Sequence, residues 1–197
     1  MVAVSAEAPA PPPARRRVPL KVWLPVGLVI AALAGFLSWD LTGSSPTPSA
    51  SGLQALPRLA VGRPAPAFRL ARLGGGPAVS LAAERGTPVV VNFFASWCRD
   101  CRAELRTFAA ASRAAGHRVD FVGVDTNDTA PAARSMLSRA GVTYPVAVED
   151  GGGTLGAYRV EGLPTTVFVS RSGRVAGEVF GAQSPAALRR WVERLED

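Results

Sequence analysis

The pattern of apolar positions changes near residue 96. Residues 89–95 (VVVNFFA) form an apolar run rich in β-branched and aromatic side chains, which is typical of a strand buried on both faces. After Ser96 the apolar positions return at helical spacing, and Gly116 is a stop signal. One face of the predicted helix carries Leu105, Phe108, Ala109 and Ser112. The pattern therefore predicts a central strand that passes directly into a helix.

Strand and helix patterns alternate along the chain on both sides of this segment. Strands are predicted at 67–73, 79–81, 118–124, 144–148, 165–170 and 175–180. Helices are predicted at 129–140, as a turn up to Tyr158, and from Pro185 onward after the cap Ser184. The first two strands form a hairpin around three glycines and the last two form an antiparallel hairpin. This alternation predicts an α/β fold with a sheet covered on both faces.

Two elements carry a more specific prediction. Pro145 lacks a backbone donor, so the strand at 144–148 is predicted to lie at an edge of the sheet or to be an extended connector. The last helix carries Leu188, Trp191, Val192 and Leu195 on one face. We expect Trp191 to contribute to core packing.

The first 57 residues differ from the rest in composition. Residues 1–21 are rich in proline and alanine before a basic cluster, and we expect them to be disordered and cytoplasmic. Residues 22–39 carry no charge and suffice to span a bilayer, with tryptophans at both ends. Residues 40–57 read as a flexible Ser/Pro linker. The expected organisation is a single-pass signal anchor followed by an extracytoplasmic domain at 58–197.

A cleaved signal peptide is the alternative for this segment. Small residues at 49–51 could be cut, but they lie far from the end of the apolar run. The length of the apolar run favours an uncleaved anchor in the cell membrane.

Charge and composition exclude two classes of function. The chain carries 22 basic and 15 acidic residues, for a formal charge of +7, but the basic residues form no block outside Arg15–Arg17. Nucleic-acid binding requires a clustered patch, so it is not expected. With two cysteines and one histidine in the whole chain, the four ligands of a zinc site are not available. No metal or organic cofactor is expected.

The cysteines stand where the predicted strand passes into the helix. Unpaired N–H groups and the helix dipole at this position favour a thiolate, so Cys98 is expected to be an acidic nucleophile. Cys101, three residues further, lies within reach for a disulfide and can resolve a mixed disulfide. A purely structural disulfide is the alternative, although so small a loop constrains the unfolded chain very little. The context favours redox chemistry.

The segment NFFASWCRDC and the later Leu163-Pro164-Thr165-Thr166 resemble two motifs of the thioredoxin superfamily, and within it of the TlpA/ResA-like membrane-tethered thiol-disulfide oxidoreductases. The similarity runs from about Gly62 to the C-terminus. It implies a thioredoxin-like three-layer fold, with a mixed central sheet, helices on both faces and an N-terminal β-hairpin. It also implies a cis peptide bond at Pro164 and a client groove formed by Trp97, Leu163, Pro164 and Thr165.

Proton transfer is expected to differ from that in thioredoxins proper, which carry a buried aspartate where this chain has Asn92. Glu104 follows Cys101 by one helical turn and matches the acid of the ResA-like group, so it is the candidate base for the Cys101 thiol. Glu161 could approach the same site, but we expect it to be solvated.

Three positions depart from the family pattern, and they bear on the redox potential. Arg99 favours the Cys98 thiolate and Asp100 opposes it. Arg106 stands where the family often has a helix-kinking proline. The resemblance therefore does not predict the redox potential of the Cys98/Cys101 couple.

The resemblance implies an extracytoplasmic protein-disulfide reductase. A membrane thiol carrier would donate electrons, and the clients would be protein thiols and disulfides, such as the haem-binding cysteines of apocytochromes c. Two alternatives remain: an oxidase that introduces disulfides into secreted proteins, and a thioredoxin-like binding or chaperone module without turnover. A thiol peroxidase is disfavoured because its nucleophile lies in a different local motif.

Overall fold

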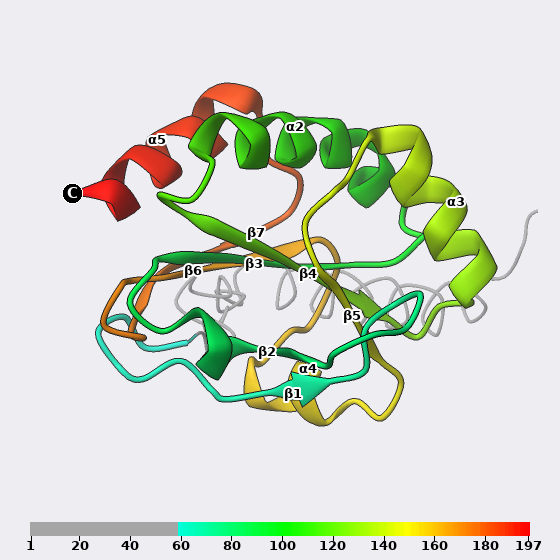
Figure 1. Cartoon of the computed structure of the whole chain (residues 1–197), viewed down its shortest axis with the longest axis horizontal. Helices are drawn as coiled ribbons and strands as arrows, with labels where there is room; N and C mark the ends of the chain where they lie inside the picture. Colours follow the sequence, from blue (N-terminus) through cyan, green and yellow to red (C-terminus); the bar gives the residue numbers. More distant parts are fainter. Residues whose placement is uncertain (1–58) are drawn as a thin grey trace, which may run out of the picture. The chain divides into compact units, whose positions relative to one another are not determined.

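The computed structural model describes residues 59–197 of the chain (Figure 1). The strands are β1 (Arg69–Leu70), β2 (Val79–Ser80), β3 (Val89–Phe94), β4 (Asp120–Thr126), β5 (Val146–Glu149), β6 (Thr165–Val169) and β7 (Val175–Phe180). The helices are η3 (Leu81–Glu84, a 3₁₀ turn), α2 (Arg99–Ala115), α3 (Ala130–Ala140), α4 (Gly153–Ala157) and α5 (Pro185–Glu196).

Five of the strands form one mixed sheet in the order β5-β4-β3-β6-β7. β3, β4 and β5 are parallel, whereas β6 is antiparallel to both β3 and β7. The predicted mixed sheet, the edge position of β5 and the β6–β7 hairpin are therefore confirmed. β3 lies in the middle, and every one of its residues is buried.

The sheet has a layer on each face (Figure 1). Helices α2, α3 and α5 cover one face, and the β1–β2 hairpin and α4 cover the other. Because side chains alternate along a strand, β3 contributes to both layers. Val89, Val91 and Phe93 join the apolar cluster under the hairpin. Val90 joins the cluster with α2 and α5. The thioredoxin-like fold predicted above is present in the described residues.

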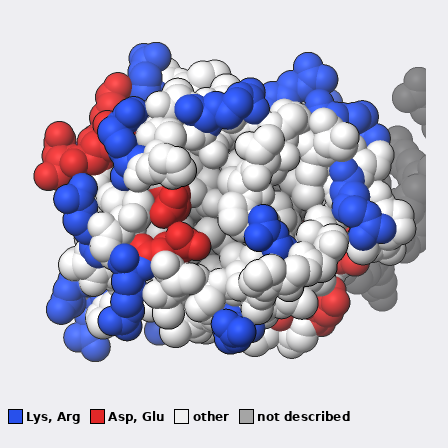
Figure 2. Space-filling model, viewed as in Figure 1, with Lys and Arg blue, Asp and Glu red and all other residues white. Residues whose placement is uncertain are grey.

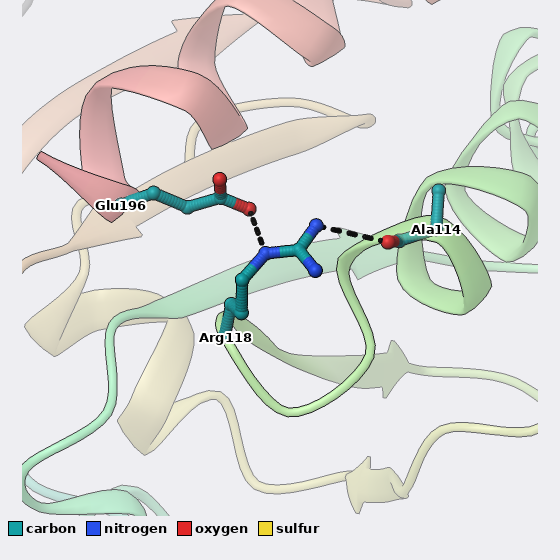
Figure 3. A network of polar contacts seen from close by, with 3 residues as sticks. All are labelled: Ala114, Arg118 and Glu196. Atoms are coloured by element: carbon teal, nitrogen blue, oxygen red, sulfur yellow. Dashed lines mark hydrogen bonds and ion pairs between the residues drawn. The ribbon is translucent and has the colours of Figure 1, made fainter.

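An ion pair joins the end of α2 to the last helix (Figure 3). The Nε of Arg118 donates to Glu196 at 3.0 Å, and one of its terminal nitrogens donates to the carbonyl of Ala114 at 3.1 Å. The Arg118 side chain is mostly exposed, so the ion pair contributes well under about 1 kcal/mol. This ion pair lies at the end of the sheet opposite the start of α2.

Several predicted strand boundaries were wrong, including that of β5, which is Val146–Glu149 rather than 144–148. The second central strand is Asp120–Thr126 rather than 118–124, because Arg118 belongs to the turn after α2. The strands of the N-terminal hairpin have two residues each instead of seven and three. Leu81 begins the 3₁₀ turn and is not part of a strand.

Charged side chains are dispersed over the visible face of the molecule. Figure 2 shows the arginines separated by neutral surface and by acidic groups. This face therefore carries no continuous basic patch of the kind that phosphate-backbone binding requires.

The predicted disordered N-terminus, membrane anchor and linker (1–21, 22–39 and 40–57) lie outside the described residues. Within residues 59–197, none of the helices combines the length and hydropathy that crossing a membrane demands.

Trp191 packs over the sheet, as predicted, although it is only partly buried. Its ring stacks on Phe168 with centroids 4.4 Å apart and planes 8° apart. The other close neighbour is Gly177 in β7, where an added Cβ would lie 2.2 Å from a ring carbon. The bare backbone of Gly177 therefore makes room for the indole.

Replacement of Gly177 by alanine should force the indole off Phe168 and lower the free energy of unfolding by about 1–3 kcal/mol, the usual cost of overpacking. Urea denaturation of the two proteins measures the difference. Gly156→Ala is the matched control, because nothing lies within 4 Å of a Cβ at that helical position, and alanine should stabilise it by up to about 1 kcal/mol. Equal stabilities of Gly177→Ala and the parent would contradict the packing argument.

Candidate active site

The cysteines lie where β3 passes into α2. Phe94 ends the strand, and α2 begins at Arg99 with Cys98 as its N-cap. Cys98 and Cys101 form a disulfide, with their Cα atoms 5.3 Å apart. The Cys98 sulfur also accepts a hydrogen bond from the backbone N–H of Cys101 at 3.1 Å. In the reduced protein the same N–H and the helix dipole would favour a Cys98 thiolate.

The two sulfurs differ in access. Cys101 is fully buried, whereas Cys98 retains 7% of its surface. Both pack in an apolar cluster with Phe94, Leu105 and, at its margin, Leu163. A partner sulfur can therefore approach Cys98 but not Cys101.

Glu104 is buried one helical turn beyond Cys101 and holds a polar network inside the core. One carboxylate oxygen accepts from the Asn92 side chain at 3.0 Å, and the other accepts from the backbone N–H of Gln183 at 2.9 Å. Asn92 also donates to Thr166 at 3.3 Å. The network thus joins α2 to β3, β6 and the segment before α5.

Burial raises the pKa of Glu104 to about 7, although the hydrogen bonds from Gln183 and Asn92 oppose the shift. The negative charge of Asp100 adds to it. The side chain can therefore exchange a proton near neutral pH. No hydrogen bond joins Glu104 to Cys101 in residues 59–197.

The turn before Cys98 is held by a second network, which the sequence analysis missed. The carboxylate of Asp128 accepts from the backbone N–H of Ser96 and, at 2.7 Å, from its hydroxyl. The guanidinium of Arg102 donates to the carbonyl of Ser96 at 2.7 Å. The peptide groups on both sides of Ser96 are thus fixed by side chains of opposite charge.

Asp128 also lies against a second acid, Asp125 at the end of β4. Burial and the nearby charge of Asp128 raise the pKa of Asp125 to about 7. Burial works against ionisation of Asp128 as well, but hydrogen bonds from Ser96, Thr129 and Asp125 hold its pKa below the ordinary value. The two carboxyl groups therefore titrate as a coupled pair, and Asp125 is the one that keeps its proton to higher pH.

The residues of the predicted client groove lie around the same end of the sheet. The peptide bond between Leu163 and Pro164 is cis, as predicted. Thr165, which begins β6, pairs with Phe93 of β3. Trp97 is 61% exposed, and its indole N–H donates to the carbonyl of Asn127 at 3.1 Å. The structure therefore brings Trp97, the Leu163–Thr165 segment and Cys98 to one end of the sheet.

The remaining candidates lie on the surface. Glu161, Arg99, Asp100 and Arg106 are exposed. Glu161 makes no hydrogen bond or ion pair within residues 59–197, in agreement with the prediction that it is solvated. Helix α2 continues through Arg106 to Ala115 without a break.

A thioredoxin-like sheet with a cysteine pair at the start of α2 defines the class: the chain is a thiol-disulfide oxidoreductase of the thioredoxin superfamily. A profile of the AhpC/TSA family matches residues 61–177, and the chain belongs to this family. It is 33% identical to the thiol:disulfide interchange protein DsbE of Escherichia coli over 89% of this chain and 92% of that protein. It is 25% identical to the thiol-disulfide oxidoreductase ResA of Bacillus thuringiensis over 70% of this chain and 80% of that protein. The resemblance to ResA-like proteins is confirmed.

Solved structures show the same fold. A putative DsbE from Chlorobium tepidum superposes with a TM-score of 0.62 at 28% identity, covering 71% of this chain and 99% of that one. A secreted Mycobacterium tuberculosis disulfide oxidoreductase homologous to DsbE superposes with a TM-score of 0.61 at 27% identity, covering 65% and 96% of the two chains.

The raised pKa of Glu104 predicts how its replacement changes the pH dependence of stability. The folded state holds this proton more tightly than the unfolded state, so stability should fall as pH rises from 4.5 to about 7. The full effect is up to about 3 kcal/mol, since one pKa unit corresponds to about 1.4 kcal/mol. Glu104→Gln should remove this part of the slope, and the part due to Asp125 should remain. Urea midpoints at pH 5 and pH 8 measure it, and equal slopes in both proteins would refute the prediction.

The Asp125–Asp128 pair predicts a coupled titration. Asp128→Asn removes a neighbouring charge, so the pKa of Asp125 should fall from about 7 toward its ordinary value. Loss of the charged acceptor for Ser96 should also cost about 1 kcal/mol of stability. Carboxyl carbon NMR follows Asp125 directly. Asp150→Asn is the control, because Asp150 is exposed and is the last of the causes that raise this pKa. An unchanged Asp125 titration in Asp128→Asn would overturn the coupling.

Proposed function

We propose that this protein is an extracytoplasmic, membrane-anchored reductase of client disulfides, with Cys98 as the nucleophile and Cys101 as the resolving thiol. The observation that carries the assignment is the unequal access of the two bonded sulfurs, 7% exposure for Cys98 against none for Cys101. A purely structural disulfide does not require its two sulfurs to differ in solvent exposure. Exchange in two steps does require it, because one sulfur must be open to the client and the other must react only with the first.

The reaction begins from the reduced pair. The Cys98 thiolate attacks one sulfur of a client disulfide, a mixed disulfide forms and the first client thiolate leaves. Cys101 then loses its proton and attacks the Cys98 sulfur, which releases the second client thiolate. The client gains two electrons, and the Cys98–Cys101 disulfide seen here is the oxidised product. A membrane thiol carrier would return the pair to the dithiol.

Glu104 is proposed to accept the Cys101 proton. Its pKa of about 7 is suited to exchange at neutral pH, and α2 places it one turn beyond Cys101. The transfer requires a bridging water or a rotation of the side chain. Asn92 cannot accept the proton, but its donation to Glu104 fixes one carboxylate oxygen.

The client is proposed to bind along Trp97, Leu163, Pro164 and Thr165. Support comes from the exposure of Trp97 and from the packing of Leu163 against the cluster that holds both cysteines. Apocytochrome c cysteines of the haem-binding motif are the proposed clients, which makes cytochrome c maturation the proposed process.

The proposed location depends on residues 22–39 as a single-pass anchor, with 1–21 in the cytoplasm, 40–57 as a linker and 58–197 outside the cytoplasm. The uncharged length of 22–39 and the basic residues before it support this arrangement. The match to DsbE covers 89% of the chain, so it includes part of the sequence before residue 59.

The reverse reaction, oxidation of exported proteins, is the second candidate. The exposed Arg99 and the N–H of Cys101 both favour the Cys98 thiolate, and a stabilised thiolate makes a disulfide more oxidising. Asp100 opposes this effect. The redox potential of the Cys98/Cys101 couple therefore decides between reduction and oxidation of clients.

Equilibration of the full chain with glutathione measures that potential. We expect a value below about −200 mV, on the side of thioredoxin, which lies near −270 mV. A value near −120 mV, as for strong oxidants, would refute the reductase and support the oxidase.

Trapping identifies the clients. Cys101→Ser should accumulate mixed disulfides in cells, because the resolving thiol is absent, and these should contain apocytochromes c. The double variant Cys98→Ser/Cys101→Ser is the control and should trap nothing. Recovery of exported proteins in general, without apocytochromes c, would contradict the proposed clients. A normal phenotype of Cys98→Ser would instead establish the binding module.

A further inference from the structure

The turn between β3 and α2 closes over four residues. The N–H of Cys98 donates to the carbonyl of Ala95 at 3.2 Å, so Ser96 and Trp97 are the two central residues of the turn. The turn ends at Cys98, which is also the N-cap of α2. The path of the turn therefore determines where the Cys98 sulfur lies relative to the first N–H groups of the helix.

The segment after β4 holds this turn at three points. The carboxylate of Asp128 accepts hydrogen bonds from the backbone N–H and from the hydroxyl of Ser96. The carbonyl of Asn127 accepts from the indole N–H of Trp97 at 3.1 Å. Both central residues of the turn thus donate to two consecutive residues that are far away in the sequence.

Asn127 and Asp128 are themselves fixed by their neighbours. Asn127 has a left-handed backbone, with φ at 48°, a conformation that asparagine tolerates better than most residues. Its N–H donates to the carbonyl of Glu149 at the end of β5, at 3.2 Å. The N–H of Thr129 donates to the carboxylate of Asp128 at 2.7 Å. The support for the turn is therefore anchored to β5 and to the start of α3.

Arg102 on α2 holds the same turn at the other peptide group of Ser96. Its guanidinium donates to the Ser96 carbonyl at 2.7 Å, and its backbone N–H donates to the Cys98 carbonyl at 3.2 Å. Burial works against ionisation of Asp128, but its hydrogen bonds hold its pKa below the ordinary value. Near neutral pH the turn therefore lies between a charged acceptor and a charged donor.

We propose that Asp128 is a positioning residue for disulfide exchange. Acting through Ser96, it holds the turn so that the Cys98 sulfur stays at the first N–H groups of α2, where a thiolate is stabilised. In the oxidised structure this placement is seen in the hydrogen bond from the N–H of Cys101 to the Cys98 sulfur, at 3.1 Å. The inference rests on the proposed function, because it requires Cys98 to be the nucleophile.

Position and charge act on the Cys98 thiolate in opposite directions. Removal of the negative charge of Asp128 would by itself favour the thiolate. Loss of the hydrogen bonds to Ser96 frees the turn, which weakens the contact of the sulfur with the helix N-terminus and disfavours the thiolate. Substitutions at Ser96 change no charge. The charged side chains on the segments around the turn are those of Arg99, Asp100, Arg102, Glu104, Asp125, Asp128 and Glu161.

The test uses the full chain carrying Cys101→Ser, in which Cys98 is the one remaining thiol and the N–H at position 101 is retained. The probe is iodoacetamide. The Cys98 thiolate forms a sulfur–carbon bond with it as the carbon–iodine bond breaks and iodide leaves. Rates measured between pH 4 and pH 10 follow the thiolate fraction, so their midpoint reports the titration of Cys98.

Well below that midpoint, Asp128→Ala should react about tenfold more slowly than the parent, which corresponds to an upward shift of about one pH unit. Ser96→Ala should react about threefold more slowly, because its backbone N–H can still donate to Asp128. Ser96→Thr should react like the parent, since its hydroxyl can make the same hydrogen bond. At pH 10 the sulfur is ionised in every variant, so all rates should agree within about threefold.

Ser170→Ala is the matched control. It removes the serine hydrogen bonds to Arg174 in the turn at the other end of the sheet. This variant loses some stability as well, but its Cys98 should titrate as in the parent. A change in stability alone is thereby separated from a change in the position of the sulfur.

An equal or faster reaction of Asp128→Ala would overturn the inference, because charge would then outweigh position. A loss in Ser96→Thr as large as that in Ser96→Ala would overturn it too, as would the same loss in Ser170→Ala. If circular dichroism shows that Asp128→Ala does not fold, Ser96→Ala decides alone, and a parental titration of that variant refutes the inference.

The outcomes also separate this inference from the proposed function. A parent whose Cys98 titrates like a free thiol, near pH 8.5, would refute the proposed nucleophile. An acidic Cys98 with the same titration in the parent, in Asp128→Ala and in Ser96→Ala would refute the positioning role alone. The alkylation rates do not depend on the direction of electron flow.

Discussion

Burial of β3 on both faces is the constraint on which the site depends. Its six residues are inaccessible to solvent, and its two neighbours hold it by parallel pairing on one side and antiparallel pairing on the other. A strand fixed in this way ends at a defined point, so the turn at Ser96 and the start of α2 are fixed as well. Cys98 owes its slight exposure, and Cys101 its full burial, to this rigid support.

Two buried carboxylic acids near this strand have a pKa near 7. Glu104 lies beneath α2 with its oxygens held by Asn92 and Gln183. Asp125 lies at the end of β4, against Asp128 and the turn that presents Cys98. Burial is the largest cause of both shifts. Near neutral pH these two carboxyl groups thus keep protons that solvent-exposed carboxyl groups would have released. This matters for the cysteine pair because disulfide exchange involves protons as well as electrons.

The element types, the edge strand, the hairpin of β6 and β7, the cis bond before Pro164 and the disulfide pair could all be predicted from the sequence, because local pattern and a specific motif determine them. The polar networks could not. Asp128 holds Ser96 across 32 residues, and Gln183 holds Glu104 across 79. Such contacts depend on the packing of strands and helices that are far apart in the sequence. The end of β4 was misplaced for a similar reason: Asp125 and Thr126 resemble a loop, but they are buried polar members of a central strand.

The contact between Arg118 and Glu196 has a practical consequence. It places the last turn of α5 beside the far end of α2, and α2 has 17 residues, which at 1.5 Å per residue amounts to about 25 Å from Cys98. A label, a biotin or a fused reporter attached after Asp197 would therefore stand well away from the cysteines. The protein can be immobilised on a sensor surface through this terminus with its reactive sulfur still facing the solution.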